Sequence, residues 1–128
     1  MAAAPVACDP AGVSIAVDLA DLAEVIAERG PAAYLVTVRD TRPHIVQVEV
    51  GWRGDALVVA AGRRTSINVA THPEVALLWP VDDQHPHHSL LVDATARVEG
   101  EALVLAPTHA VLHRAGGRRR RPPVEGGA

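Results

Sequence analysis

A glycine near the middle of the chain is followed by two adjacent arginines and two hydroxyl residues. The order is Gly62, Arg63, Arg64, Thr65, Ser66. The run from Ser66 to His72 predicts one or two helical turns that stop before Pro73, because proline disfavours helix in the residue that precedes it. Free N–H groups at a helix start carry partial positive charge, and guanidinium groups donate in a rigid fork. The segment predicts an anion site centred on Arg63 and Arg64, although paired loop arginines can also be merely solvated.

The residues before this segment predict two strands joined by a turn. From His44 to Val50 the side chains alternate between two faces, which is the pattern of a half-buried strand. One face carries Val46, Val48 and Val50, and the other carries Ile45, Gln47 and Glu49. Arg53-Gly54-Asp55 predicts the turn, and Ala56 to Ala61 predicts the second strand, which Gly62 ends. Gln47 is a stronger site candidate than Glu49, because a lone glutamate on an edge strand usually faces solvent.

A helix and a further strand are predicted upstream. Asp18 suits the N-cap position, and apolar residues recur at helical spacing after it until Gly30-Pro31 ends the helix at about Arg29. We expect this amphipathic helix to cover one end of the domain. Tyr34 to Arg39 then predicts a strand, and the turn Asp40 to Pro43 leads into the hairpin.

The second half of the chain predicts more strands around a polar loop. Pro80 to His88 contains three histidines and two aspartates, but their spacing matches no standard metal-ligand set, so no metal site is predicted. Ser89 to Glu99 alternates as a strand, with Val98 among its inward residues. Ala102 to Ala106 predicts the last strand, and Pro107 to Arg114 predicts a helix with proline in its first turn.

Composition divides the chain into three parts. Residues 1–14 are expected to be a flexible N-terminus, 15–114 a single domain, and 115–128 a disordered arginine-rich tail. The net charge is −3, and the tail carries four arginines and one glutamate, so the remainder carries −6. An acidic body is not typical of a nucleic-acid-binding domain. The tail alone could contact an acidic surface or a nucleic acid, but it has no aromatic residues for stacking.

Several classes of protein are disfavoured by composition. No stretch approaches the roughly 20 apolar residues that a membrane span needs. The single cysteine, Cys8, cannot form an internal disulfide, and the N-terminal residues lack the charged start of a signal peptide, so a cytoplasmic location is expected. No catalytic triad or pair of carboxylates is recognisable, and His44, His109 and His113 could be structural or reactive.

The segment from Arg42 to Trp79 resembles the pyridoxamine 5'-phosphate oxidase-like flavoproteins of the FMN-binding split-barrel superfamily, especially the short actinobacterial kind. The matching residues are Arg42-Pro43, Gly54-Asp55, Ala60, Gly62-Arg63-Arg64, Asn68-Val69 and His72-Pro73-Glu74-Val75, followed by the apolar strand Ala76 to Trp79. Two positions depart from the family pattern. Thr65 stands where many relatives have a phosphate-binding lysine, Ala60 stands where they have a threonine, and the chain contains no lysine.

The resemblance implies a fold and a cofactor site. The implied fold is mainly β, a six-stranded antiparallel Greek-key split β-barrel with a few short helices. The implied assembly is a homodimer with FMN at the subunit interface, the ring along the strand Val46 to Glu49 and the phosphate at the turn after the next strand. The implied cofactor-binding residues are Val46, Gln47, Val48, Glu49, Ala60, Arg63, Arg64, Thr65, Asn68 and Trp79.

Three functions are compatible with this resemblance. The first is an FMN-dependent oxidoreductase acting on an unidentified small molecule, and the second is a deazaflavin-dependent reductase or cofactor-binding protein. The third is a degenerate, non-catalytic split barrel that serves as an interaction module. A true pyridoxamine phosphate oxidase is not expected, because its C-terminal substrate-binding segment is not recognisable here. Structural roles also remain open for Asn68 as a helix partner, Thr65 as an N-cap and Trp79 as a core residue.

Overall fold

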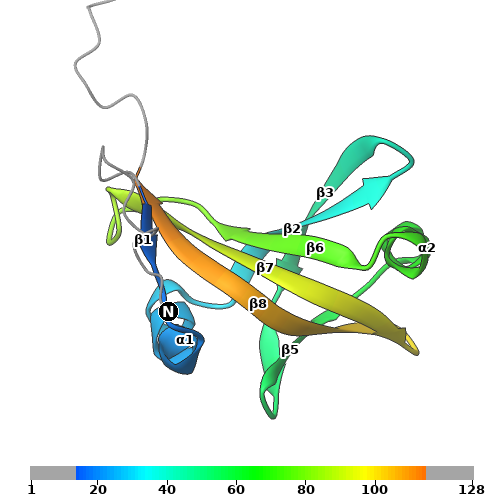
Figure 1. Ribbon diagram of the computed structural model, residues 1–128, viewed down its shortest axis with the longest axis horizontal. Coiled ribbons are helices and arrows are strands. Elements are labelled where there is room, and N and C mark those ends of the chain that lie inside the picture. Colours follow the sequence, from blue (N-terminus) through cyan, green and yellow to red (C-terminus); the bar gives the residue numbers. More distant parts are fainter. Residues whose placement is uncertain (1–13, 115–128) are drawn as a thin grey trace, which may run out of the picture.

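The computed structural model describes residues 14–114, which form one curled antiparallel sheet with two short α-helices (Figure 1). The predicted N-terminal segment, apart from Ser14, and the predicted arginine-rich tail lie outside the described residues. The strands are β1 (Ser14–Ala16), β2 (Ala32–Arg39), β3 (Arg42–Glu49), β4 (Gly51–Arg53), β5 (Ala56–Ala60), β6 (Glu74–Trp79), β7 (His88–Glu99) and β8 (Ala102–Arg114). The helices are a 3-10 turn (Leu19–Asp21), α1 (Leu22–Arg29) and α2 (Arg63–Thr71).

The strand order confirms the predicted split barrel and corrects its strand count. Neighbouring strands follow the order β3-β2-β6-β7-β8-β5-β4, with β1 paired to β8. The sheet therefore has eight strands in place of the six predicted. The additional strands are β1 and β4, each of three residues. Both are too short to show a period in the sequence, and each becomes a strand only because a neighbouring strand accepts its backbone hydrogen bonds.

The helix predicted from Pro107 to Arg114 is wrong, because β8 continues through these residues. Ala94 pairs with Pro107 and Asp93 pairs with His109, so Thr108 is an extra residue at a β-bulge. The Thr108 hydroxyl donates a hydrogen bond of 3.2 Å to the carbonyl oxygen of Asp93. A bulge tolerates the missing N–H of proline within a strand.

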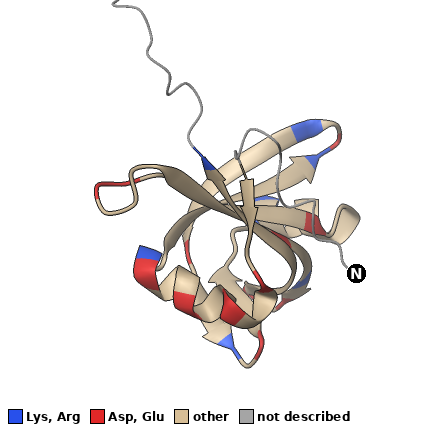
Figure 2. Ribbon diagram, turned by 60° about the vertical axis from the view of Figure 1, so that its left-hand side comes forward, with Lys and Arg blue, Asp and Glu red and all other residues tan. Residues whose placement is uncertain are grey.

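Helix α1 covers one end of the curled sheet, as the sequence predicted (Figure 2). Asp18 caps the preceding 3-10 turn by accepting a hydrogen bond of 3.2 Å from the N–H of Ala20. Gly30 ends α1 with φ of 90°, a conformation that glycine adopts without steric cost. Leu22 and Ile26 point into the core. Among the described residues, no helix is long and apolar enough to cross a membrane.

The core fills the inside of the curled sheet with leucine, valine and alanine around one large aromatic residue. Trp79 is 2 % exposed, and its indole N–H donates a hydrogen bond of 2.9 Å to the carbonyl oxygen of Gly30. This bond joins β6 to the end of α1. Val98, predicted to face inward, is instead 39 % exposed, because it lies near the end of β7 beyond the core.

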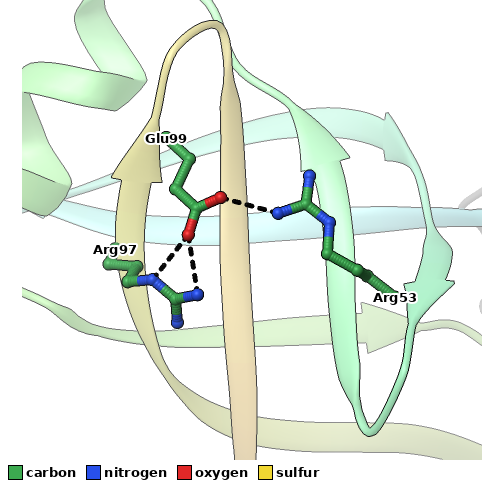
Figure 3. Close-up of polar contacts among 3 residues, drawn as sticks. All are labelled: Arg53, Arg97 and Glu99. Atoms are coloured by element: carbon green, nitrogen blue, oxygen red, sulfur yellow. Dashed lines mark hydrogen bonds and ion pairs between the residues drawn. The ribbon is translucent and has the colours of Figure 1, made fainter.

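The carboxylate of Glu99 joins strand β7 to strand β4 on the surface of the sheet (Figure 3). Glu99 at the end of β7 accepts a hydrogen bond of 2.6 Å from Arg53 on β4 and bonds of 2.7 and 2.8 Å from Arg97. The hydrogen bonds from Arg53 and then Arg97 lower the pKa of Glu99 below its ordinary value. The side chains are between 39 % and 64 % exposed, so we expect the network to contribute little to the stability of the fold.

The loop between β6 and β7 is a compact turn in the structure. Asp82 accepts hydrogen bonds from the N–H groups of Gln84 at 3.0 Å and His85 at 2.7 Å. Its carboxylate also lies 3.1 Å from the ring nitrogen Nδ1 of His85. Across residues 14–114, no three side chains of the metal-ligating types gather at one point.

Candidate functional site

A groove lies where the two halves of the barrel approach each other without pairing. Strand β3 forms an edge of the sheet and is hydrogen-bonded only to β2 within the described residues. Its inner face lies opposite the end of β5 and the start of α2, and the space between them measures about 360 Å³. The lining residues are His44, Val46, Gln47, Val48, Ala60, Gly62, Arg63, Arg64 and Thr65.

The start of α2 forms the cationic end of the groove. The helix begins at Arg63, earlier than predicted, with Gly62 as its N-cap, and no side chain caps it. The first helical hydrogen bond runs from the N–H of Ser66 to the carbonyl of Gly62 at 3.0 Å. The N–H groups of Arg63, Arg64 and Thr65 therefore have no partner within the helix. With two guanidiniums beside them and no acidic residue in the first turn, they favour an anion.

Two polar side chains of α2 are buried, and one of them bonds the helix to the sheet. Thr65 is 4 % exposed and Asn68 is 3 % exposed, and they lie about one turn apart on the inner face of the helix. The amide nitrogen Nδ2 of Asn68 donates a hydrogen bond of 3.1 Å to Oγ1 of Thr37 on β2. The suggestion that Thr65 caps the helix is wrong, because Gly62 occupies that position. Asn68 therefore bonds α2 to β2. The sequence had left open a structural role for Asn68 within the helix itself.

The structure brings together most of the predicted cofactor-binding residues. Seven of them line the groove: Val46, Gln47, Val48, Ala60, Arg63, Arg64 and Thr65. Three others do not line it. Glu49 is exposed at the end of β3, Asn68 bonds to Thr37, and Trp79 is buried in the core.

His44 was not among the predicted site residues, yet it lines the groove. Its place could have been inferred from the alternation of the strand, because His44 falls on the same face as Val46 and Val48. The ring nitrogen Nδ1 is buried and has no hydrogen-bond partner among residues 14–114. Gly62 was also missed as a lining residue; it has no side chain and exposes its backbone there.

A second cavity, of about 670 Å³, adjoins the groove at the start of α2. It shares Arg63 and Arg64 with the groove and is also lined by Arg39 and His72. Asp40, which lies in the turn after β2 with φ of 57°, is the only acidic residue that the described part of the chain contributes to this lining. Residues 14–114 contribute no acidic side chain to the lining of the groove itself, although the chain up to residue 114 carries a net charge of −6. Cationic groups are therefore concentrated around the start of α2.

Solved structures of other proteins share the fold of this chain. A putative pyridoxamine 5'-phosphate oxidase from Listeria innocua matches with a TM-score of 0.60 and 17% identity, over 74% of this chain and 98% of that chain. An FAD-binding protein from Mesorhizobium loti matches with a TM-score of 0.62 and 10% identity, over 80% and 98%. An F420 reductase matches with a TM-score of 0.56 and 20% identity, over 68% and 94%. The chain is thus a split-barrel protein of the pyridoxamine 5'-phosphate oxidase-like fold.

Relatives by sequence place the chain in a family. Uncharacterized proteins of Mycobacterium bovis and Mycobacterium tuberculosis are each 36% identical to it over 116 residues, covering 77% of this chain and 80% of theirs. The chain belongs to the same family as these mycobacterial proteins. No family model matches it.

Proposed function

We propose that the groove between β3 and α2 binds a flavin-type cofactor through its phosphate, and that the protein is an FMN-dependent oxidoreductase acting on a small molecule. The observation that carries this proposal is the convergence of seven predicted residues on one groove with a purely cationic end. An acceptor-only phosphate matches that end, where guanidiniums, a hydroxyl and unpaired helix N–H groups all donate. The solved structures with the same fold, which include an FAD-binding protein and an F420 reductase, add support.

Each part of the groove has a distinct role in this proposal. Arg63, Arg64 and Thr65 hold the phosphate. Val46 and Val48 place apolar side chains along the groove, and the free edge of β3 offers unpaired backbone N–H and C=O groups to the polar rim of a flat ring. The flavin ring supplies the electron chemistry when it is bound. The protein supplies position and hydrogen bonds, so no ionisable catalyst is assigned.

A deazaflavin-dependent reductase is the second candidate, because a specific observation favours it. The cavity of about 670 Å³ continues the cationic surface past Arg64 to Arg39, which gives space for a ligand with more anionic groups than FMN has. Thr65 and Ala60, which depart from the flavoprotein pattern, also favour this candidate or a non-catalytic interaction module.

We also propose that the protein is located in the cytoplasm. Cell fractionation would test this location.

Absorption and fluorescence titrations distinguish these candidates. We expect the purified protein to quench FMN fluorescence on binding. The dissociation constant for FMN should be lower than that for riboflavin, which lacks the phosphate. Tighter binding of a deazaflavin with a phosphorylated side chain would support the second candidate. Binding of neither compound would contradict both cofactor proposals and leave the interaction module.

We also propose that the protein forms a homodimer through the outer face of the sheet. Directly opposed residues place side chains on the same face of a sheet. The outer face carries an apolar stripe formed by Tyr34, Val36, Ile45, Leu78, Leu91 and Val111, which are paired across neighbouring strands. Ile45 is 59 % exposed and Tyr34 is 37 % exposed. The stripe spans five strands, and exposed apolar patches of this kind commonly mark an interface.

Changing Ile45 to glutamate is expected to weaken the dimer. A charge in the apolar stripe would be desolvated without a partner, so the dissociation constant of the dimer should rise by on the order of 10-fold or more. Sedimentation velocity over a concentration series measures this change. Ile67→Glu is the matched control, because Ile67 is 57 % exposed but lies on α2. A monomeric wild-type protein, or equal weakening by both variants, would contradict this assignment of the interface.

A further inference from the structure

A cavity outside the proposed cofactor site lies between the start of α1 and the turn that joins β4 to β5. Its volume is about 580 Å³, and no described residue that lines it also lines the groove. Leu19, Leu22, Trp52 and Pro107 make much of its lining apolar. Leu19 is 43 % exposed and Trp52 is 40 % exposed. Exposed apolar side chains gathered around a hollow commonly mark a surface that a binding partner covers.

Carboxylates follow α1 from this cavity to the other end of the helix (Figure 2). Asp21, Glu24 and Glu28 are exposed, and their spacing of three and four residues places them on one side of the helix. None of the three is in an ion pair with another residue of the described part of the chain. Asp55 adds a carboxylate at the cavity itself. A partner that matches this surface combines an apolar segment with several positive charges.

The arginine-rich tail has this combination of residues. β8 ends at Arg114, and 14 residues follow it. Gly116-Gly117 comes first, and glycine is the residue that most readily allows the chain to reverse. Arg118 to Arg121 then supply four positive charges, and Pro122-Pro123-Val124 supplies an apolar segment. The charges therefore come before the apolar residues along the tail, as they do along α1 when the helix is followed toward the cavity.

The sheet register places the start of the tail beside the end of α1. Trp79 donates a hydrogen bond of 2.9 Å to Gly30, which follows α1. In the sheet, Trp79 lies in the same row as Leu112 of β8, two strands away. The other end of α1 is at the cavity, which Pro107 of β8 also lines. A chain that leaves β8 after Arg114 and reverses therefore runs along α1 toward the cavity.

The tail is also long enough for this path. Seven residues of extended strand separate Pro107 from Arg114, which corresponds to about 25 Å at most. After a reversal at Gly116-Gly117, the seven residues from Arg118 to Val124 span the same distance when extended. The arginines then pass the carboxylates of α1, and the apolar residues reach the cavity.

We propose that residues 115–128 dock on their own domain, with Arg118 to Arg121 along α1 and Pro122-Pro123-Val124 in the cavity against Trp52. A single exposed ion pair contributes little, but several guanidiniums that face several carboxylates form a network. Covering Trp52 and Leu19 adds the burial of apolar area. The acidic surface that the tail contacts is thus that of its own domain, and no cofactor in the groove is required.

A nitroxide spin label near the end of the tail tests this position in the full-length protein. The variant Cys8→Ser with Gly126→Cys has a single thiol for the label, because Cys8 is the only cysteine of the chain. We expect the label to broaden the NMR signal of the Trp52 indole N–H strongly and that of Trp79, at the other end of α1, only weakly. High salt should reduce the broadening, because it screens exposed charges. Equal broadening of both indoles, or none, would overturn the proposal.

A charge exchange tests the pairing of arginines with carboxylates. Changing Arg118 to Arg121 to glutamate should abolish the broadening, since like charges then face each other. Adding Glu24→Arg and Glu28→Arg to that variant should restore it. The matched control adds Glu74→Arg and Glu101→Arg instead, at exposed positions at the start of β6 and in the turn between β7 and β8, and should restore nothing. Restoration by both pairs, or by neither, would overturn the assignment of α1 as the docking surface.

Mixed samples distinguish the protein's own tail from that of a neighbouring copy. Nitrogen-15-labelled protein without the spin label is combined with unlabelled protein that carries it at residue 126. We expect no broadening at Trp52 in this mixture at low protein concentration. Broadening there as strong as in the sample that carries both labels on one chain would show docking between copies and would overturn docking within one chain.

Discussion

Replacing Arg63 and Arg64 together with alanine is expected to lower the affinity for FMN by on the order of 100-fold or more. Each guanidinium can donate charge-assisted hydrogen bonds to a phosphate, and a hydrogen bond to a charged group contributes about 1.5–3 kcal/mol. Both side chains are exposed at the first turn of α2, and neither is in an ion pair within the described residues. The loss should therefore come from binding and leave stability nearly unchanged. Fluorescence titration measures it.

A matched control separates the phosphate site from general charge. The double variant Arg53→Ala and Arg97→Ala also removes two positive charges, but it removes them from the network around Glu99 outside the groove. It should retain FMN affinity within a few-fold. Each single variant, Arg63→Ala or Arg64→Ala, should show a smaller loss than the double variant, since the remaining guanidinium still donates. Equal losses in the two double variants would refute a specific phosphate site.

Those parts of the candidate site that depend on residues adjacent in the sequence could be predicted. The alternation from His44 to Val50 determines which side chains of β3 share a face, and Gly62 with the two arginines marks a turn and its donors. These features depend on neighbours in the sequence. The closeness of β3 and α2 comes from distant parts of the chain and was implied only by the resemblance to a known fold.

Features set by long-range contacts were missed or misassigned. The residues from Pro107 to Arg114 have a helix-like start, but pairing with β7 and the bulge at Thr108 make them a strand. Asn68 could not be assigned from sequence, because its partner Thr37 is 31 residues away. His44 was an ordinary strand histidine until the structure placed the start of α2 next to it. In each case the structure of the segment or the role of the residue depends on a contact with another helix or strand. Local propensity does not include such contacts.

Changing Trp79 to alanine is expected to lower the free energy of unfolding by about 3–5 kcal/mol, as for other buried aromatic residues truncated in a core. The side chain is 2 % exposed and belongs to the central apolar cluster, in a domain that has few other aromatic residues to fill the cavity. The carbonyl of Gly30 would also lose its indole donor at the end of α1. Urea denaturation followed by circular dichroism measures the change. Typical domains have only 5–15 kcal/mol of stability, so this variant should be close to unfolding.

The milder variant Trp79→Phe separates the core role of this residue from a cofactor role. Phenylalanine keeps most of the apolar volume but has no N–H for Gly30, so the loss should be smaller, about 1–3 kcal/mol. Because Trp79 does not line the groove, the folded variant should bind FMN with wild-type affinity. A clear fall in FMN affinity, with the fold intact, would show that the flavin contact first inferred from the family resemblance is real. Unchanged affinity with lower stability would establish that Trp79 supports the barrel by joining β6 to the end of α1.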